Sequence, residues 1–373
     1  MRKDDLIYQI ALTTVPGIGN VHAKILAQHF GSAEAIFRAP LSMLEQLEGI
    51  GQVRGRAIRS FSNFAAAEKE IRFIEQYGVR TMFLNDPDYP RRLLNCYDPP
   101  VLLYCKGDTG FNCDKSVAVI GTRANSQYGK KITEALLRDL HDLLQDAGKE
   151  LMVVSGLAFG IDAIAHNTAL DLGIPTAGVL AHGLGTIYPK EHAALARKMT
   201  QKGGALLTEF TSREQPDKHH FPVRNRIVAG LCDCTIVIET DVKGGSMITA
   251  ELANGYNRDV FAVPGKITDT KSAGCNQLVL LNKAILLTGA EQLVEAMNWT
   301  KNEKLPAAAP MLFPDLNEQE SKLVDLMRQK EQVHLDEFRV QTALTPGTLA
   351  GALLNLEMMQ VIEALPGKRY KLR

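Results

Sequence analysis

The chain has 373 residues, of which 45% are hydrophobic and 23% charged, as is typical of a folded protein with about two or three domains. Lys and Arg together number 42, and so do Asp and Glu, so no overall positive charge favours a polyanion and any nucleic-acid site must be a local patch. The six cysteines include no C-x-x-C pair, so we expect reduced buried thiols and no metal site. No apolar run approaches membrane-spanning length, and Asp4 and Asp5 interrupt a signal-peptide pattern. We therefore expect a cytoplasmic protein without a membrane partner.

Residues 1–75 are predicted to form a small helical domain of the helix-hairpin-helix or SAM-like type. PGIGNVHAKIL (residues 16–26) and EGIGQVRGRAI (residues 48–58) share Gly-Ile-Gly before a helical pattern. Free backbone N–H groups at the start of the second helix of such a motif can hold a DNA phosphate. The glycines could equally serve tight helix packing alone. Lys24, Arg54 and Arg56 favour phosphate contact only weakly.

Residues 76–298 alternate short apolar runs with amphipathic helical patterns. Helices are indicated at residues 130–144, 161–172 and 246–256. We predict strands at residues 79–84, 101–104, 117–120, 151–154, 176–180, 205–208, 235–238, 260–263 and 285–287. This alternation predicts an α/β fold: a doubly wound, extended Rossmann-like and mainly parallel sheet, with loops gathered at one edge.

The proline- and alanine-rich residues 299–316 are predicted to be a linker, followed by a winged helix over residues 317–373. Helical patterns at residues 318–329, 335–340 and 346–358 precede a hairpin around Pro366 and Gly367. Winged helices commonly bind duplex DNA. However, PGTLAGALLNLEMMQ, the presumed third helix, contains no Lys or Arg. Docking of a protein, or modest DNA binding, is therefore the better interpretation.

The first two glycine turns of the central domain follow predicted strands and are candidate anion sites. Gly121 permits a close turn before a helix, while Thr122 adds a hydroxyl and Arg123 a planar fork suited to phosphate. The next strand ends in Ser155 and Gly156. A nicotinamide-binding fold would carry Asp or Glu there to hold the ribose. We therefore expect no dinucleotide and no other cofactor.

Two further segments add cations and an aromatic ring to the same predicted edge. HHFPVRNRIVAGL (residues 219–231) and KGGSMITAEL (residues 243–252) each lead into a helix. As structural alternatives, the ring of Phe221 could pack in the core, and Arg224 and Arg226 could be buried in ion pairs. Several anion-binding loops in a row exceed the needs of one nucleotide and favour a single-stranded polynucleotide. The candidate DNA-binding residues from these segments are Phe221, Arg224, Asn225, Arg226, Lys243, Gly245 and Ser246.

An enzyme is the alternative hypothesis. KGGSMITAE loosely resembles the P-G-G-x-G-T-x-x-E loop of Rossmann-like nucleoside-monophosphate phosphoribohydrolases, with Glu251 as the carboxylate and Glu209 as a second one. The fit fails at Lys243, Met247 and Ile248, where that loop has Pro, Gly and Thr. A duplex-DNA transcription regulator is a minor third hypothesis, based on the winged helix alone.

Taken together, the motifs resemble the DNA-processing protein A (DprA or Smf) family. GTRANSQYG, SGLAFGIDAIAH, FPVRNRIVAGL, GGSMITAELA, FAVPG and SAGCNQL occur in that family's order over residues 86–296, and the flanking domains fit its longer members. The sequence departs from the pattern at His182 and His192, at Asn257, and at Asn282 with Lys283. These departures leave the candidate residues intact.

The resemblance implies a non-enzymatic protein that binds incoming single-stranded DNA during natural transformation, protects it and loads RecA onto it. It further implies a homodimer formed through the Rossmann-like core, cooperation with single-strand binding protein, and no nucleotide cofactor. By the same resemblance, Arg123 and Arg224 would contact backbone phosphates, and Phe221 and Asn225 would lie near a base.

Overall fold

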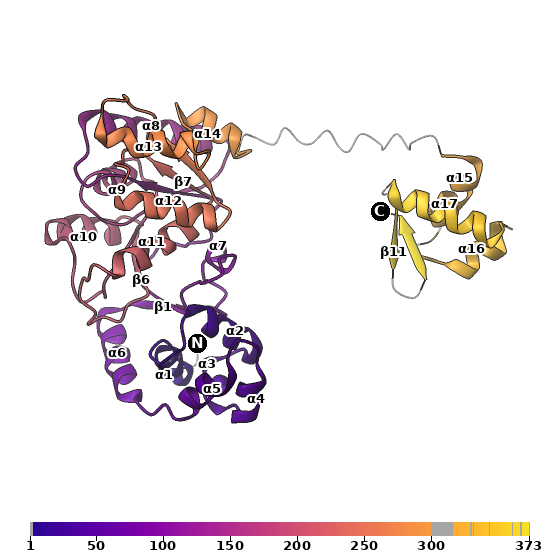
Figure 1. Cartoon of the computed structure of the whole chain (residues 1–373), viewed down its shortest axis with the longest axis horizontal. Helices are drawn as coiled ribbons and strands as arrows, with labels where there is room; N and C mark the ends of the chain where they lie inside the picture. The colour runs from indigo at the N-terminus through magenta and orange to yellow at the C-terminus, as the bar shows by residue number, and fades with distance from the viewer. Residues whose placement is uncertain are drawn as a thin grey trace. The chain divides into compact units, whose positions relative to one another are not determined.

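The computed structural model describes residues 3–299, 316–328, 330, 332–342, 344–359, 361–365 and 368–372. The chain forms two compact units, Met1–Lys301 and Asn302–Arg373, which we describe separately (Figure 1). The first unit holds the helical N-terminal segment and the nine-stranded sheet, and the second holds the winged helix. Among the described residues, we find no helix with the length and apolar character that crossing a membrane requires.

The N-terminal segment consists of six helices and contains both predicted hairpins. The helices are α1 (Lys3–Leu12), α2 (Asn20–Phe30), α3 (Ala33–Arg38), α4 (Leu41–Gln46), α5 (Gly51–Arg59) and α6 (Phe64–Tyr77). The turns before α2 and α5 contain Gly17 at φ 78° and Gly49 at φ 83°, a backbone conformation that favours glycine. The predicted domain boundary after residue 75 falls within α6 and stays a prediction.

The central sheet has nine strands, and each coincides with a predicted one. They are β1 (Arg80–Phe83), β2 (Leu102–Gly107), β3 (Lys115–Ile120), β4 (Leu151–Ser155), β5 (Thr176–Val179), β6 (Ala205–Thr208), β7 (Cys234–Val237), β8 (Asp259–Ala262) and β9 (Ile285–Leu286). Their order is β1-β2-β6-β5-β4-β3-β7-β8-β9. Strand β2 pairs antiparallel with both β1 and β6, and all the neighbouring pairs from β6 to β9 are parallel. The winding direction reverses between β3 and β7, and ligands of such sheets bind beyond the carboxyl ends of the strands at this point.

Helices cover both faces of the sheet because the apolar residues of each strand alternate in direction. In β3, Val117 and Val119 pack in one apolar layer with Leu137 of α8, while Ala118 and Ile120 pack in the other layer, which includes α11 and α12. The helices of this part are α7 (Arg91–Leu94), α8 (Gln127–Asp146), α9 (Ile161–Asp171), α10 (Ala193–Gln201), α11 (His220–Gly230), α12 (Gly245–Gly255), α13 (Thr270–Leu280) and α14 (Ala290–Ala296).

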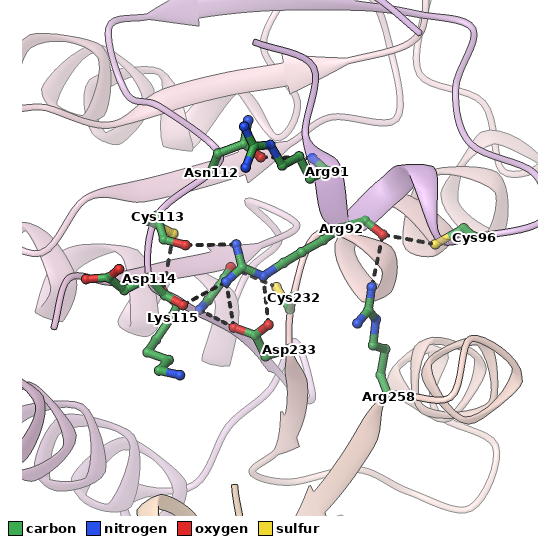
Figure 2. A network of polar contacts seen from close by, with 11 residues as sticks. Arg91, Arg92, Cys96, Asn112, Cys113, Asp114, Lys115, Cys232, Asp233 and Arg258 are labelled. Carbon is green, nitrogen blue, oxygen red and sulfur yellow. Dashed lines mark hydrogen bonds and ion pairs between the residues drawn. The ribbon is translucent and has the colours of Figure 1, made fainter. Parts of the chain in front are cut away.

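A largely buried arginine, Arg92, fixes α7 to the amino ends of the strands (Figure 2). The Arg92 Nε lies 2.8 Å from Oδ1 of Asp233, and its Nη2 lies 2.9 Å from Oδ2. The same guanidinium donates to the backbone carbonyls of Cys113 and Asp114, each at 3.0 Å. Asp233 also accepts from the N–H of Ser116 at 2.9 Å. This amino-edge network therefore holds the start of β3, the start of β7 and α7 in one arrangement.

The second unit is a winged helix, as predicted. Its helices and strands are α15 (Glu318–Arg328), β10 (Val333–His334), α16 (Leu335–Thr342), α17 (Pro346–Met358), β11 (Ile362–Leu365) and β12 (Arg369–Leu372). The strands form a sheet in the order β10-β12-β11. Residues 300–315 of the predicted linker and the predicted turn at Pro366 and Gly367 lie outside the described residues. Trp299, predicted to begin the linker, is instead only 4% exposed and packs in the first unit with the layer of α8 and α14.

Candidate nucleic-acid interface

A cleft of about 340 Å³ lies at the carboxyl edge of the sheet, where the winding direction reverses. Its walls are the loop after β3, the start of α11 and the start of α12. Most of the predicted site residues meet in this cleft, although they are far apart in the sequence. Those that line it are Gly121, Thr122, Arg123, Gly156, Phe221, Arg224, Asn225, Gly245 and Ser246. Ser155, Arg226 and Lys243 are outside its lining.

The loop after β3 is packed closely against its neighbours. A Cβ atom on Gly121 would lie 2.5 Å from Ile161, so a larger residue would not fit without displacing α9. The N–H of Thr122 donates to the carbonyl of Glu239 at 2.7 Å, and the Thr122 carbonyl accepts from the N–H of Ile161 at 3.2 Å. The fold itself therefore uses the backbone donor and the backbone acceptor of Thr122.

An internal carboxylate occupies the start of α8, where we expected a ligand phosphate. Glu239 follows β7, is fully buried, and accepts from the backbone N–H of Ser126 at 2.8 Å and from the Ser126 hydroxyl. Gly129 makes room for this carboxylate, since a Cβ there would lie 2.3 Å from its Oε2. A negative charge at a helix start is favourable because it meets unpaired N–H groups and the positive end of the helix dipole. Sequence reasoning missed Glu239, and its only signal was a glutamate directly after a strand.

The exposed cation of the cleft lies over an aromatic ring. The guanidinium carbon of Arg123 is 5.3 Å from the centre of the Phe221 ring, and Phe221 in turn lies 6.0 Å from the Tyr188 ring. Arg123 is exposed, Phe221 is half-buried, and Tyr188 is 45% exposed. Stacking on a ring orients the planar guanidinium while its donors remain available to an anion. Tyr188 was missed by sequence reasoning; an aromatic residue in a glycine-containing loop was the available signal.

Arg224 lines the cleft but uses its donors within the protein. It is 5% exposed; its Nη1 donates to the carbonyl of Gly156 at 2.5 Å and to that of Val179, and its Nε donates to Oδ1 of Asn225 at 3.1 Å. Burial lowers the pKa of Arg224 to about 10, opposed by Asp162, so it remains cationic at neutral pH. Arg224 thereby joins the ends of β4 and β5. Its predicted contact with phosphate stays a prediction, and the geometry favours a positioning role.

Gly156 and Asp162 complete the support of that arginine. A Cβ on Gly156 would lie 2.6 Å from the Arg224 guanidinium, so the glycine makes room for it. The Asp162 carboxylate accepts from the N–H of Gly156 at 3.0 Å and from that of Ala158 at 3.3 Å. Burial raises the pKa of Asp162, while Arg224 and these hydrogen bonds act in the opposite direction. The positive charge of Arg224 thus faces a carboxylate across the turn after β4.

Three predicted site residues have other positions. Arg226 is 6% exposed, pairs with the Glu209 carboxylate and donates to the Asp98 carbonyl at 2.6 Å. The Ser155 hydroxyl is buried and donates to the Val119 carbonyl at 2.6 Å, so it is not at the surface of the cleft. Lys243 is exposed in the loop before α12. For Arg226, burial in a structural ion pair, the alternative raised from the sequence, is what the structure contains.

The start of α12 lies at the cleft without a side-chain cap. Its N-cap residue is Gly244, which provides no side-chain cap, and Gly245 and Ser246 line the cleft. The first N–H groups of a helix have no partner within the helix, so an uncapped start can bind an anion. Within the described lining, the exposed carboxylate is Asp241 and the exposed cation is Arg123.

The carboxylates of the enzyme hypothesis do not meet in this cleft. Glu251 pairs with Lys283 at 2.7 Å, and both side chains are nearly half exposed outside the cleft lining. Glu209 is largely buried, pairs with Arg226 and lines a different cavity. The pair therefore lacks the convergence that two-carboxylate glycosidic cleavage requires.

Comparison with known proteins agrees with the resemblance. Residues 80–298, more than half of the chain, match the model of the DNA recombination-mediator protein A family. The chain belongs to this family. Residues 306–368 match the DprA winged helix domain, and residues 10–71 match a helix-hairpin-helix motif.

Relatives of the family support the assignment along the whole chain. Protein Smf of Synechocystis is 31% identical and aligned over 100% of both chains. The X-ray structure of DprA from Streptococcus pneumoniae has a TM-score of 0.64 and 33% identity, covering 78% of this chain and 97% of that chain. A solved structure of DprA from Helicobacter pylori, described as having a unique single-stranded DNA binding mode, has a TM-score of 0.52 and 30% identity, covering 60% of this chain and 97% of that one.

Proposed function

We propose that this protein binds single-stranded DNA in the cleft at the carboxyl edge of its sheet. The observation that carries the proposal is the exposed Arg123 stacked on Phe221, with Tyr188 beside that ring. Partly exposed rings beside a cation match the requirements of unpaired DNA, because bases stack on aromatic side chains and phosphates bind guanidinium groups. The single-stranded DNA binding mode described for the Helicobacter pylori relative supports it.

Each part of the cleft has a role in this proposal. A phosphate is held by the Arg123 fork, and a second by the uncapped start of α12 at Gly245 and Ser246. Bases stack on Phe221 and Tyr188. Asn225 receives the Arg224 Nε at its Oδ1, which leaves its amide N–H groups for the edge of a base. Since most of these contacts are with phosphates and ring faces, binding should depend little on base sequence.

The wider role follows from the family. We propose that the protein is a recombination mediator without catalytic activity, which protects incoming DNA in natural transformation and loads RecA onto it, working with single-strand binding protein. We propose a cytoplasmic location, which its six free cysteines support because thiols stay reduced there. The proposed loading of RecA is tested by measuring RecA filament formation on DNA coated with single-strand binding protein. Filaments that form no faster with the protein present would refute the loading step.

An exposed apolar edge of the sheet supports the proposed homodimer. Leu280 and Leu281 at the end of α13 are 80% and 52% exposed, and Ile285 and Leu286 of the edge strand β9 are 41% and 40% exposed. Exposed apolar residues next to an edge strand are typical of a surface that pairs with another chain. Replacing Leu280 by Glu should convert the dimer to a monomer in light scattering. A dimer that persists at the same concentrations argues against this surface.

The cleft itself is tested by titration with matched single- and double-stranded oligonucleotides at several salt concentrations. Wild type should prefer the single strand, with a log–log salt slope of about −0.7 for each phosphate neutralised. Arg123→Ala should bind about tenfold more weakly and lose about one such phosphate contact. Arg138→Ala, which removes an exposed arginine of α8 outside the cleft lining, is the control. Equal affinities of wild type and Arg123→Ala would overturn the assignment.

A further inference from the structure

A second groove, of about 640 Å³, lies between α6 and the loops that follow β5 and β6. Five of its lining residues recur along α6 at the spacing i, i+3, i+4, i+7 and i+8, and so share one face of the helix. They are Lys69, Arg72, Phe73, Gln76 and Tyr77. Gly185, Ser212, Arg213 and Gln215 complete the lining from the two loops. We call this the α6 groove.

The lining of the α6 groove contains cations and no carboxylate. Lys69, Arg72 and Arg213 are exposed, and their side chains have no hydrogen bond or ion pair among the described residues. The lining contains no Asp or Glu. Glu70 lies next to it in sequence, but it is buried and accepts from the N–H and the hydroxyl of Ser212, both at 2.7 Å. This acid is therefore used to tie α6 to the loop after β6, and the exposed Glu68, Glu75 and Glu214 lie outside the lining.

Aromatic rings lie among these cations. The rings of Phe73 and Tyr77 are 4.6 Å apart, and Tyr77 is 51% exposed. Burying so large a ring is the ordinary result of folding, so an exposed ring supported by a second ring and flanked by Lys and Arg favours a ligand with both flat and anionic parts. An acidic peptide would satisfy the cations but would leave the exposed ring without a stacking partner.

The loop after β5 joins this groove to the cleft. Gly185 lines the α6 groove, and Tyr188 of the same loop contacts Phe221 in the cleft. The loop is braced, because the N–H of Gly185 donates to the Ser212 carbonyl at 3.1 Å. A DNA single strand that leaves the cleft across Tyr188 therefore reaches the α6 groove next.

We propose that the α6 groove is a second binding tract for the same DNA single strand, which extends from the cleft past Tyr188 to α6. This inference rests on the proposed function. It assigns a DNA contact to the helical N-terminal segment that does not involve its hairpin glycines. Of the hairpin cations, Lys24 donates to the carbonyls of Leu94 and Cys96, and Arg54 to those of Gly17 and Gly49.

The test compares oligothymidines of about 4 and about 16 nucleotides, the range of lengths that one single-strand-binding fold covers. The variant Lys69→Ala/Arg72→Ala should bind the long oligonucleotide about tenfold more weakly, with a salt slope smaller by about 0.7 for each cation removed. Its affinity for the short oligonucleotide should equal that of wild type. Lys131→Ala/Arg138→Ala removes two exposed cations from α8 outside both linings and should change neither affinity.

A second variant distinguishes stacking from charge. Tyr77→Ala should weaken binding of the long oligonucleotide by about tenfold, while Tyr77→Phe keeps the ring and should retain it. If the short oligonucleotide fails to bind, or binds equally to wild type and Arg123→Ala, the proposed function fails. If short-oligonucleotide binding depends on Arg123 but the groove variants bind the long one like wild type, only the α6 groove proposal fails. If the groove variants lose binding to a polyglutamate peptide but still bind the long oligonucleotide like wild type, the groove is a protein-binding site. That result would also overturn the α6 groove proposal.

Discussion

Two arginines at opposite edges of the central sheet, Arg92 and Arg123, have opposite environments. At the amino edge, Arg92 is paired with both oxygens of Asp233 and surrounded by backbone carbonyls (Figure 2). At the carboxyl edge, Arg123 is exposed and rests on the ring of Phe221. Burial disfavours the charged form of Arg92, but the hydrogen bonds to Asp233 outweigh it and raise the Arg92 pKa. A cation enclosed by acceptors stabilises the fold, whereas one left on an aromatic face remains available to a ligand.

The largest expected effect comes from breaking the amino edge. Arg92→Met should lower the free energy of unfolding by about 3 kcal/mol, because it leaves the largely buried Asp233 without its partner charge. Urea denaturation measures this change. At urea concentrations where the variant is folded, its affinity for single-stranded DNA should match that of wild type. A variant that keeps its stability but loses DNA binding would reverse the roles that we assign to the two edges.

The next effect tests whether the wall of the cleft depends on Gly156. Gly156→Ala places a methyl group on the Arg224 guanidinium, so that side chain must shift, with a loss of about 2 kcal/mol in stability by overpacking. DNA affinity should fall as well, because Asn225 loses its hydrogen-bond partner. Thermal unfolding and oligonucleotide titration measure the two effects. Gly255→Ala, at the end of α12 in open space, is the matched control and should be nearly neutral. Unchanged stability in Gly156→Ala would show that Arg224 is not held as described.

A smaller effect tests stacking at the carboxyl edge. Phe221→Ala should weaken DNA binding by about tenfold, within the range measured for a base stacked on an aromatic ring. Phe221→Leu keeps much of the apolar volume without a flat face and should bind as weakly as the alanine variant. Combined with Arg123→Ala, the loss should be less than the product of the two single losses, because the two side chains contact each other. Strictly multiplicative losses would argue against their acting together.

The fold could be predicted because its signals are local. Strands buried on both faces appear as short apolar runs, and every predicted strand lies on an observed one. The site could be predicted in part, because parallel strands bring the turns after β3 and β4 to one edge. Whether a residue of α11 lines the cleft depends instead on the direction in which its side chain leaves the helix. Arg224 and Arg226 are two positions apart on α11, about 200° around a helix of 3.6 residues per turn, so they cannot line the same cleft.

The missed residues show a second limit of sequence reasoning. Glu239 and Tyr188 act on partners distant in the sequence, Ser126 and Phe221, and only the assembled sheet brings them together. A carboxylate after a strand can be a catalyst, a ligand or an internal cap, and the sequence alone does not decide between them. By contrast, the stripe of cations and rings on α6 has helical spacing, and could have been recognised from the residues.

The smallest effect concerns the layer beneath the cleft and uses pH. His166 of α9 is fully buried, and its Nδ1 lies 2.7 Å from the Thr176 hydroxyl. Burial, aided by the charges of His192 and Arg224, lowers the pKa of His166 from 6.5 to about 3. Between these two values the unfolded chain binds a proton that the folded protein does not, so stability falls as the pH decreases below 6.5.

From pH 6.5 to one unit below, this single histidine should remove about 1 kcal/mol from the free energy of unfolding, because the unfolded state gains the proton. Chemical denaturation at a series of pH values measures the slope. In His166→Gln the slope over this range should decrease by the contribution of one group, even if the variant is less stable at every pH. If His166→Gln has the same pH slope as wild type, His166 takes up its proton in the folded protein. The layer beneath the cleft is then more open to water than the burial of His166 indicates.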